Sequence, residues 1–325
     1  MKNILLFNTA LGSMNIGDKV IYDSALIALG PLLNEACVYE CPTHTRCHSI
    51  LQNLLFRKKL SAYRNVDYQF ICGTNLLYVN MLRPLPNWNI DLLNTGVAKN
   101  AILLGVGLGK NATKANLYTR LLYKRTLSKS FIHSVRDEAT KVFLEDMGFR
   151  ALNTGCVTMW GLSQEHLAQV PTSKSDEVVF TLTHYTPDEA RDREMIKILG
   201  RNYNKLYFWP QAFQDIAYLE RLNATDEITI IPSNLISYQK LLQGQIDYVG
   251  NRLHGGVYAI QQKKRAVILS IDYRTVNMFG SNSPIVIPRH DIETLRYKIN
   301  STFSTSLPVH YEKIKLWLNQ FGVTY

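Results

Sequence analysis

Short apolar runs alternate with amphipathic stretches along the whole chain, a pattern that predicts strands followed by helices and therefore parallel sheets. In the first half the apolar runs predict strands at Ile4–Phe7, Cys37–Glu40, Tyr68–Cys72, Ala101–Gly105 and Phe131–Val135. In the second half they predict strands at Val178–Leu182, Lys205–Trp209, Ile228–Ile231, Ile246–Val249 and Ala266–Ile271. Apolar residues at helical spacing fill the intervals, as in Asp137–Met147, which ends before Gly148.

A polar stretch with proline and serine, Gln169–Asp176, interrupts this rhythm and is the best candidate for a linker. A chain of 325 residues fits two domains of about 150 residues each. We therefore expect an N-terminal Rossmann-like domain at 1–168, a C-terminal one at 176–307, and a final helix at 308–325 that packs back on the N-terminal domain. The predicted fold class is α/β, with two parallel sheets facing each other across a cleft where their carboxyl ends bind ligands.

The composition is that of a globular protein, with 46% hydrophobic and 19% charged residues. No apolar run approaches the roughly 18 residues that a membrane span requires. The apolar stretch that begins at Ile4 ends at Asn8, which is too short for the core of a signal peptide. We therefore expect a cytoplasmic protein.

The formal net charge of +10 indicates an anionic partner. Phosphorylated substrates and the anionic surface of a membrane both qualify, whereas no nucleic-acid-binding motif is apparent. The five cysteines form an odd set spread through the chain, so we expect no disulfide framework. The cluster from Cys37 to His48 lacks the paired C-x2-C spacing of zinc sites, so we expect no metal.

Three predicted strand-to-helix junctions in the first half carry small or polar residues. In the first, Gly17 allows a close approach beside Asn15, and Asp18 caps the next helix or acts in the site. In the second, Gly73, Thr74 and Asn75 offer amides and a hydroxyl to an anion or a sugar. The third contains Gly107 in a Gly-x-Gly-x-Gly run whose spacing does not fit dinucleotide binding.

A fourth junction places Arg136 where a strand ends and a helix begins. An arginine at the carboxyl edge of a sheet can hold a carboxylate or a phosphate with two hydrogen bonds. A surface pairing with Asp137 or Glu138 is the alternative explanation.

The strongest local pattern lies in the second half, where Arg252, Leu253 and His254 follow a predicted strand and precede Gly255 and Gly256. In an extended segment this spacing puts Arg252 and His254 on the same face. The two glycines would open a helix whose free amides attract phosphate. The next strand ends with a second acid–arginine pair, Asp272 and Arg274.

Taken together and in this order, these segments resemble those of the polysaccharide pyruvyl transferases. The matching segments are Asn15–Asp18, Gly73–Leu77, Gly105–Gly109, Ser134–Asp137, Thr154–Thr158, Asp247–Gly256 and Ile271–Arg274. The resemblance implies a GT-B-like pair of domains and a metal-independent transfer, without a cofactor, from phosphoenolpyruvate to a sugar, which forms a pyruvate ketal. It further implies a role in exopolysaccharide or capsule biosynthesis, with a glycan or lipid-linked sugar as acceptor, in the cytoplasm or at the inner face of the cell membrane.

Residue by residue, the resemblance implies that Arg252 and His254 contact phosphoenolpyruvate from the C-terminal, donor domain. Arg136 assists from across the cleft, on the probable acceptor side. As a mechanism we expect His254 to supply the proton and Arg136 to hold the carboxylate. Arg252 and the amides of Gly255 and Gly256 would hold the phosphate. The candidate base for the sugar hydroxyl is Asp18.

Two other functions remain open. A GT-B-type glycosyltransferase would use a nucleotide sugar and bind its ribose through an acid such as Asp272 or Asp226. A non-catalytic module that binds nucleic acid or anionic glycan would show steeply salt-dependent binding and consume no small molecule.

Overall fold

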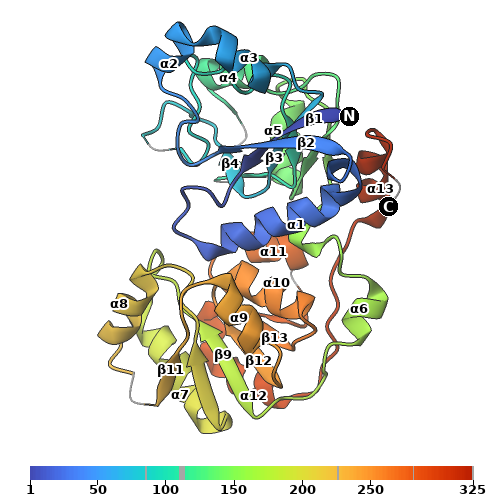
Figure 1. Cartoon of the computed structure of the whole chain (residues 1–325). Helices are drawn as coiled ribbons and strands as arrows, with labels where there is room; N and C mark the ends of the chain where they lie inside the picture. Colours follow the sequence, from blue (N-terminus) through green and yellow to red (C-terminus); the bar gives the residue numbers. More distant parts are fainter. Residues whose placement is uncertain (85, 110–113, 225–226, 281, 324–325) are drawn as a thin grey trace. The chain divides into compact units, whose positions relative to one another are not determined.

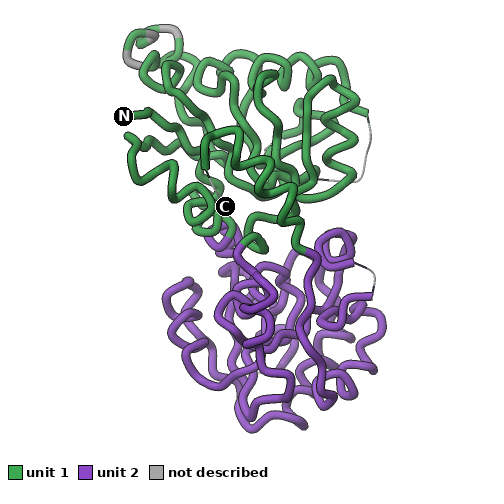
Figure 2. The backbone as a smooth tube through the Cα atoms, turned by 90° about the vertical axis from the view of Figure 1, so that its right-hand side faces the viewer, with its two compact units in different colours: residues 1–13, 21–160, 309–325 green, residues 14–20, 161–308 purple. Residues whose placement is uncertain are grey.

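The computed structural model describes the whole chain except residues 85, 110–113, 225–226, 281 and 324–325 (Figure 1). The chain is an α/β protein with parallel sheets, as predicted. It divides into two compact units (Figure 2): unit 1 contains residues 1–13, 21–160 and 309–325, and unit 2 contains residues 14–20 and 161–308. The predicted domains were 1–168 and 176–307. The structure instead groups residues 14–20 and 161–168 with the second unit.

Unit 1 is built on a parallel sheet with the strand order β2-β1-β3-β5. Successive side chains of β1 point to opposite faces of this sheet: Leu5 and Phe7 enter one apolar core, and Ile4 and Leu6 enter the other. Two short parallel pairs, β4 with β6 and β7 with β8, extend the structure beyond β5. The strands of unit 1 are β1 Lys2–Asn8, β2 Ala36–Pro42, β3 Tyr68–Cys72, β4 Asn75–Leu77, β5 Ile102–Leu104, β6 Gly107–Leu108, β7 His133–Val135 and β8 Ala151–Asn153.

The C-terminal helix completes the core on one face of this sheet. Ile314, Trp317 and Leu318 are fully buried there, and the indole of Trp317 donates a hydrogen bond to the carbonyl of Ile132 at 2.7 Å. Trp317 therefore serves packing. The helices that lie at least partly in unit 1 are α1 Ile16–Leu33, α2 Ile50–Leu55, α3 Arg57–Arg64, α4 Leu117–Thr126, α5 Glu138–Glu145, the 3-10 helix Val157–Met159 and α13 Tyr311–Asn319.

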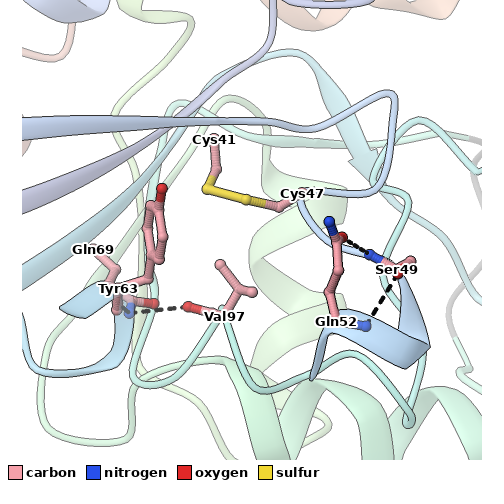
Figure 3. The surroundings of a disulfide bond; sticks show 7 residues. All are labelled: Cys41, Cys47, Ser49, Gln52, Tyr63, Gln69 and Val97. Carbon is pink, nitrogen blue, oxygen red and sulfur yellow. Dashed lines mark hydrogen bonds between the residues drawn. A yellow bond between two sulfur atoms is a disulfide. The ribbon is translucent and has the colours of Figure 1, made fainter. Parts of the chain in front are cut away.

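A disulfide joins Cys41 at the end of β2 to Cys47 in the following loop (Figure 3). Their Cα atoms lie 5.7 Å apart because the loop turns back on the strand before Ser49 caps α2. We expected no disulfide framework, and the sequence did not predict this single bridge. Cys37, Cys72 and Cys156 are free thiols.

Unit 2 contains a parallel sheet with the strand order β11-β10-β9-β12-β13-β14. This is the 3-2-1-4-5-6 order of a Rossmann fold, and β12 is buried at every position, as expected of a central parallel strand. The strands are β9 Glu177–Thr181, β10 Lys205–Phe208, β11 Ile228–Ile230, β12 Ile246–Gly250, β13 Ala266–Ser270 and β14 Val286–Pro288. The helices are α6 Gln164–Ala168, α7 Glu189–Asn202, α8 Gln214–Arg221, α9 Leu235–Leu241, α10 Leu253–Gln261, α11 Tyr273–Phe279, the 3-10 helix Arg289–Thr294 and α12 Leu295–Asn300.

The direction of chain progression reverses between β9 and β12, which are hydrogen-bonded neighbours in the sheet. Ligands of open α/β sheets bind at the carboxyl edge beside such a switch point. The segments that follow β9 and β12 are therefore the first place to look for a site in unit 2.

Candidate functional site

Arg252 directly follows the switch-point strand β12 and is the last residue before α10. Its side chain is buried, with 2% of its surface exposed. Nη2 donates to both carboxylate oxygens of Asp215, at 2.5 and 2.6 Å, and Nε donates to the carbonyl of Leu182 at 3.0 Å. This guanidinium therefore ties the β12–α10 junction to the segments that follow β9 and β10.

Asp215 is fully buried in the first turn of α8 and collects hydrogen bonds from several elements. Besides Arg252, it accepts the backbone amides of Gln211, Ala212 and His184, at 3.2, 3.0 and 3.1 Å. It also lies 2.8 Å from Nδ1 of His184. A carboxylate with this many donors organises the edge of the sheet around it.

His254 is the second residue of α10 and is 8% exposed. The helix begins at Leu253, two residues earlier than expected, so the segment is not extended and the same-face argument does not apply. The amides of Gly255 and Gly256 both donate to the carbonyl of Arg252, at 3.0 and 3.3 Å. These amides are therefore used in backbone hydrogen bonds within the protein. The absence of side chains at Gly255 and Gly256 leaves room for neighbouring side chains.

The space at Gly255 is filled by Gln211. A β-carbon at position 255 would lie 2.4 Å from Nε2 of Gln211, and one at position 17 would lie 3.2 Å from its Oε1. The backbone amide of Ile16 donates to the carbonyl of Gln211 at 2.9 Å. The side chain of Gln211 thus lies between two glycine motifs that are far apart in the sequence. Its Nε2 is buried and has no hydrogen-bond partner among the described residues.

This contact explains why residues 14–20 group with unit 2. Asn15, Gly17 and Asp18 therefore lie at the same sheet edge as Arg252. Helix α1 begins at Ile16, so Asp18 is in its first turn and does not cap it. The amide of Gly17 is instead accepted by the side chain of Asn15 at 3.2 Å.

Tyr185 links the two arginines of this edge. The guanidinium of Arg252 lies 4.7 Å from the centre of its ring, and Nη2 of Arg274 donates to its hydroxyl at 3.3 Å. Asp272 caps α11 and pairs with Arg274 at 2.6 Å. Burial raises the pKa of Tyr185, but the charges of Arg274 and Arg252 and the hydrogen bond from Arg274 outweigh it, so that the pKa lies below its usual value.

The candidate residues of unit 1 lie on β6 or in the segments that follow β3 and β7. Arg136 follows β7 and is buried, with 3% of its side chain exposed. Its Nε is 3.4 Å from the carboxylate of Asp137, whereas its Nη2 is buried without a partner among the described residues. The guanidinium occupies the place that a side chain at Gly107 would need.

The loop between β3 and β4 reaches the same strand pair. Gly73 and Thr74 both have positive φ, of 74° and 55°, and the carbonyl of Thr74 accepts the amide of Gly107 at 2.9 Å. A β-carbon on Gly73 would lie 2.2 Å from Cγ2 of Ile21, so this position needs glycine. The Oδ1 of Asn75 is buried and has no partner among the described residues. The structure thus brings Gly73, Thr74, Asn75, Gly107 and Arg136 together within unit 1.

Unit 1 also contains a cavity of about 460 Å³. Tyr78 lies beside Gly109, which follows β6, and its ring occupies the place that a side chain at Gly109 would need. The guanidinium of Arg83 lies 4.1 Å from the centre of that ring. The cavity is lined by Arg46, Met81, Leu82, Arg83, Pro84, Pro86, Asn89, Ile90, Asp91 and Tyr118.

Sequence reasoning gave the two central residues of unit 2, Asp215 and His184, little or no weight. Asp215 has no motif around it, and the only available signal was a polar segment, Gln211–Asp215, after a strand. Asp226 lies outside the described residues. In the part of the chain that the structure describes, no group of three or more His, Cys, Asp or Glu side chains could hold a metal ion. In that same part, no helix is long and apolar enough to cross a membrane.

The parallel sheets of both units and the Rossmann strand order of unit 2 define an α/β protein of the Rossmann-like class. The family model for polysaccharide pyruvyl transferases matches residues 15–273, which include Arg136, Arg252 and His254. The chain belongs to this family, and it is therefore a transferase of polysaccharide biosynthesis. None of the curated proteins matches the chain significantly.

Two solved structures resemble the chain over its full length. The S. aureus MnaA–UDP co-structure has a TM-score of 0.52 at 10% sequence identity and covers 100% of this chain and 99% of its own. The UDP-GlcNAc 2-epimerase from Neisseria meningitidis bound to UDP-GlcNAc has a TM-score of 0.47 at 10% identity and covers 99% of both chains. The first similarity shows a shared fold of two Rossmann-like domains.

Proposed function

We propose that this protein transfers the enolpyruvyl unit of phosphoenolpyruvate to two hydroxyl groups of a sugar, in a surface polysaccharide or its precursor, and forms a pyruvate ketal. The observation that carries the proposal is the buried guanidinium of Arg136, whose Nη2 has no partner among the described residues. A buried cationic donor without a partner is costly, and a bound carboxylate would complete it with charge-assisted hydrogen bonds.

The other roles follow from the contacts of each side chain. His254 supplies the proton that C3 of the enol gains, since imidazole exchanges a proton readily near neutral pH. Arg252 is neutralised by Asp215 and positions the β12–α10 junction that carries His254. Arg274, whose side chain is 23% exposed, would bind the phosphate. No cofactor is part of this proposal, because departure of phosphate from phosphoenolpyruvate completes the transfer.

With phosphoenolpyruvate as donor, the reaction belongs in the cytoplasm. The net charge of +10 would favour the inner face of an anionic membrane, where lipid-linked sugars are made.

The test is release of phosphate from phosphoenolpyruvate against a panel of glycosides, with mass spectrometry of the product. A ketal product would support the proposal, and Arg136→Met should then raise KM for phosphoenolpyruvate at least tenfold, about 1.4 kcal/mol of binding. Arg125→Met is the matched control, since it removes one exposed positive charge from unit 1. Consumption of a nucleotide sugar, together with thermal stabilisation by nucleotide sugars and none by phosphoenolpyruvate, would show a glycosyltransferase instead.

A further inference from the structure

We propose that His184, oriented by Asp215, is the general base that takes the proton of the acceptor hydroxyl group. This inference rests on the proposed function. It assigns to His184 the role that sequence analysis gave to Asp18.

The hydrogen bonds of His184 fix which ring nitrogen carries the proton. Nδ1 lies 2.8 Å from Oδ1 of Asp215, and Nη2 of Arg252 lies 3.4 Å from the same Nδ1. The two contacts make opposite demands on Nδ1, because a carboxylate accepts a hydrogen whereas a guanidinium donates one. The shorter, carboxylate contact prevails. In the neutral ring Nδ1 therefore carries the hydrogen, and Nε2 has the lone pair that a base requires.

Asp215 holds the ring in a fixed orientation. It is fully buried, and it also accepts the backbone amide of His184 at 3.1 Å, so backbone and side chain are anchored to one group. The histidine side chain itself is 30% exposed. A buried carboxylate that orients an accessible imidazole through Nδ1 is the arrangement by which hydrolases set the tautomer of a catalytic base.

The surroundings of the ring come from three segments. Asp215 is on α8, Arg252 precedes α10, and the ring of Tyr185 lies edge-on with its centre 5.8 Å from that of His184. Arg274 is hydrogen-bonded to the far end of Tyr185. His184 follows β9, at the switch point where a Rossmann sheet binds its ligand.

Exposure separates His184 from Asp18. A base must come within hydrogen-bond distance of the hydroxyl that it deprotonates. Asp18 is 6% exposed in the first turn of α1. The imidazole of His184 is 30% exposed and is oriented by a buried carboxylate.

The step balances as follows. A lone pair of the first sugar hydroxyl forms a bond to C2 of the enolpyruvyl unit, its proton moves to Nε2 of His184, and C3 gains a proton from His254. Phosphate then leaves C2 with the bonding electron pair, and the second hydroxyl bonds to C2. The proton of the second hydroxyl restores His254, and the proton on His184 leaves with phosphate. No oxidant or reductant is required.

The experiment uses the full chain and the variant His184→Asn. Asparagine keeps a donor near the position of Nδ1, so the bond to Asp215 survives while the base is lost. We expect kcat to fall by about 10²–10⁴-fold, with KM for phosphoenolpyruvate within about threefold of wild type. We also expect the acid-side fall in the pH profile of kcat to disappear. His290→Asn, which changes an exposed histidine of unit 2, is the control. It should keep the wild-type kcat and the acid-side fall in the pH profile.

A His184→Asn enzyme with kcat within threefold of wild type would overturn the assignment. So would a slow variant whose acid-side fall persists, because that fall would then come from another group or from the phosphate of the substrate. Should His184→Asn fail to fold, His184→Gln is judged by the same two readouts. If the wild-type protein consumes no phosphoenolpyruvate with any glycoside, the proposed function itself fails, which is a different result from an active wild type with an active variant.

Discussion

Gly107 lies directly beneath the guanidinium group of Arg136. A β-carbon at position 107 would be 2.3 Å from Nε and 2.7 Å from Cζ of that arginine, well inside contact distance. The glycine on β6 therefore makes room for the side chain of the arginine that follows β7. This relationship gives Gly107 a role in positioning Arg136 that no hydrogen bond of its own would suggest.

We predict that Gly107→Ala displaces Arg136 and raises KM for phosphoenolpyruvate about tenfold, about 1.4 kcal/mol, while unit 1 stays folded. Steady-state kinetics and a thermal unfolding curve check the two parts. Gly30→Ala is the control: a β-carbon there meets nothing within 4 Å, so KM should not change. An unchanged KM for Gly107→Ala would mean that the position of Arg136 does not matter for the donor.

A second prediction concerns Gln211 and the glycine that makes room for it. We expect Gly255→Ala to destabilise unit 2 by about 1–3 kcal/mol, because its β-carbon would meet Nε2 of Gln211 at 2.4 Å and the hydroxyl of Tyr248 at 3.1 Å. In a Gln211→Ala background the cost should fall by about 1 kcal/mol, since the closest atom is gone.

Urea unfolding of the two single variants and the double variant measures this coupling. Gly200→Ala, at a helical position with nothing within 4 Å, is the control and should be neutral or slightly stabilising. Additive effects of Gly255→Ala and Gln211→Ala would show that the two residues are not in contact.

A third prediction follows from the buried pair of Asp215 and Arg252, which are 0% and 2% exposed. Asp215→Leu should destabilise unit 2 by about 3–5 kcal/mol, because it leaves the guanidinium buried without its counter-charge. The double variant Asp215→Leu/Arg252→Met should cost much less than the sum of the single ones. Urea unfolding followed by far-ultraviolet circular dichroism is the measurement, and a cost of the double variant equal to the sum of the two single costs would contradict the prediction.

Much of the fold could be predicted from the sequence because its central strands are continuous apolar runs. The predicted strands Ile4–Phe7 and Tyr68–Cys72 correspond to β1 and β3, and all five strands predicted for the second half are present. The strands that prediction missed, such as β4 and β6, have two or three residues. A run this short has no measurable period, and the glycine of β6 was interpreted as part of a loop.

The candidate site could be predicted only where a local sequence motif marks it. The Arg252–His254 segment was found, but its conformation was not, because an arginine and a histidine around one leucine fit either an extended segment or a helix start. Asp215 was missed because its importance comes from partners at His184 and Arg252, which are 31 and 37 residues away. Likewise, nothing local in Asn15–Asp18 reveals that Gln211 holds it against unit 2. Long-range hydrogen bonds produce no periodic pattern and no fixed residue spacing that could be recognised in a single sequence.

The last prediction concerns pH and His133, which is buried in β7. Its Nδ1 accepts the amide of Leu103 at 3.2 Å, and its Nε2 donates to the carbonyl of Ser128 at 2.9 Å. Both ring nitrogens are therefore satisfied only in the neutral form. Burial lowers the pKa of His133 to about 4, which outweighs the opposite effect of the bond to Ser128.

Because the folded pKa is depressed, the unfolded chain binds the proton first as the pH falls. The stabilisation is therefore complete above about pH 6.5 and is lost progressively down to about pH 4, by about 3 kcal/mol in the free energy of unfolding of unit 1. Urea unfolding followed by tryptophan fluorescence reports mainly on this unit, since Trp88, Trp160 and Trp317 lie in it. In His133→Gln, whose amide accepts and donates without titrating, this part of the pH dependence should vanish. If the variant and the wild type lose the same free energy between these pH values, another group is responsible and His133 is not held neutral by the fold.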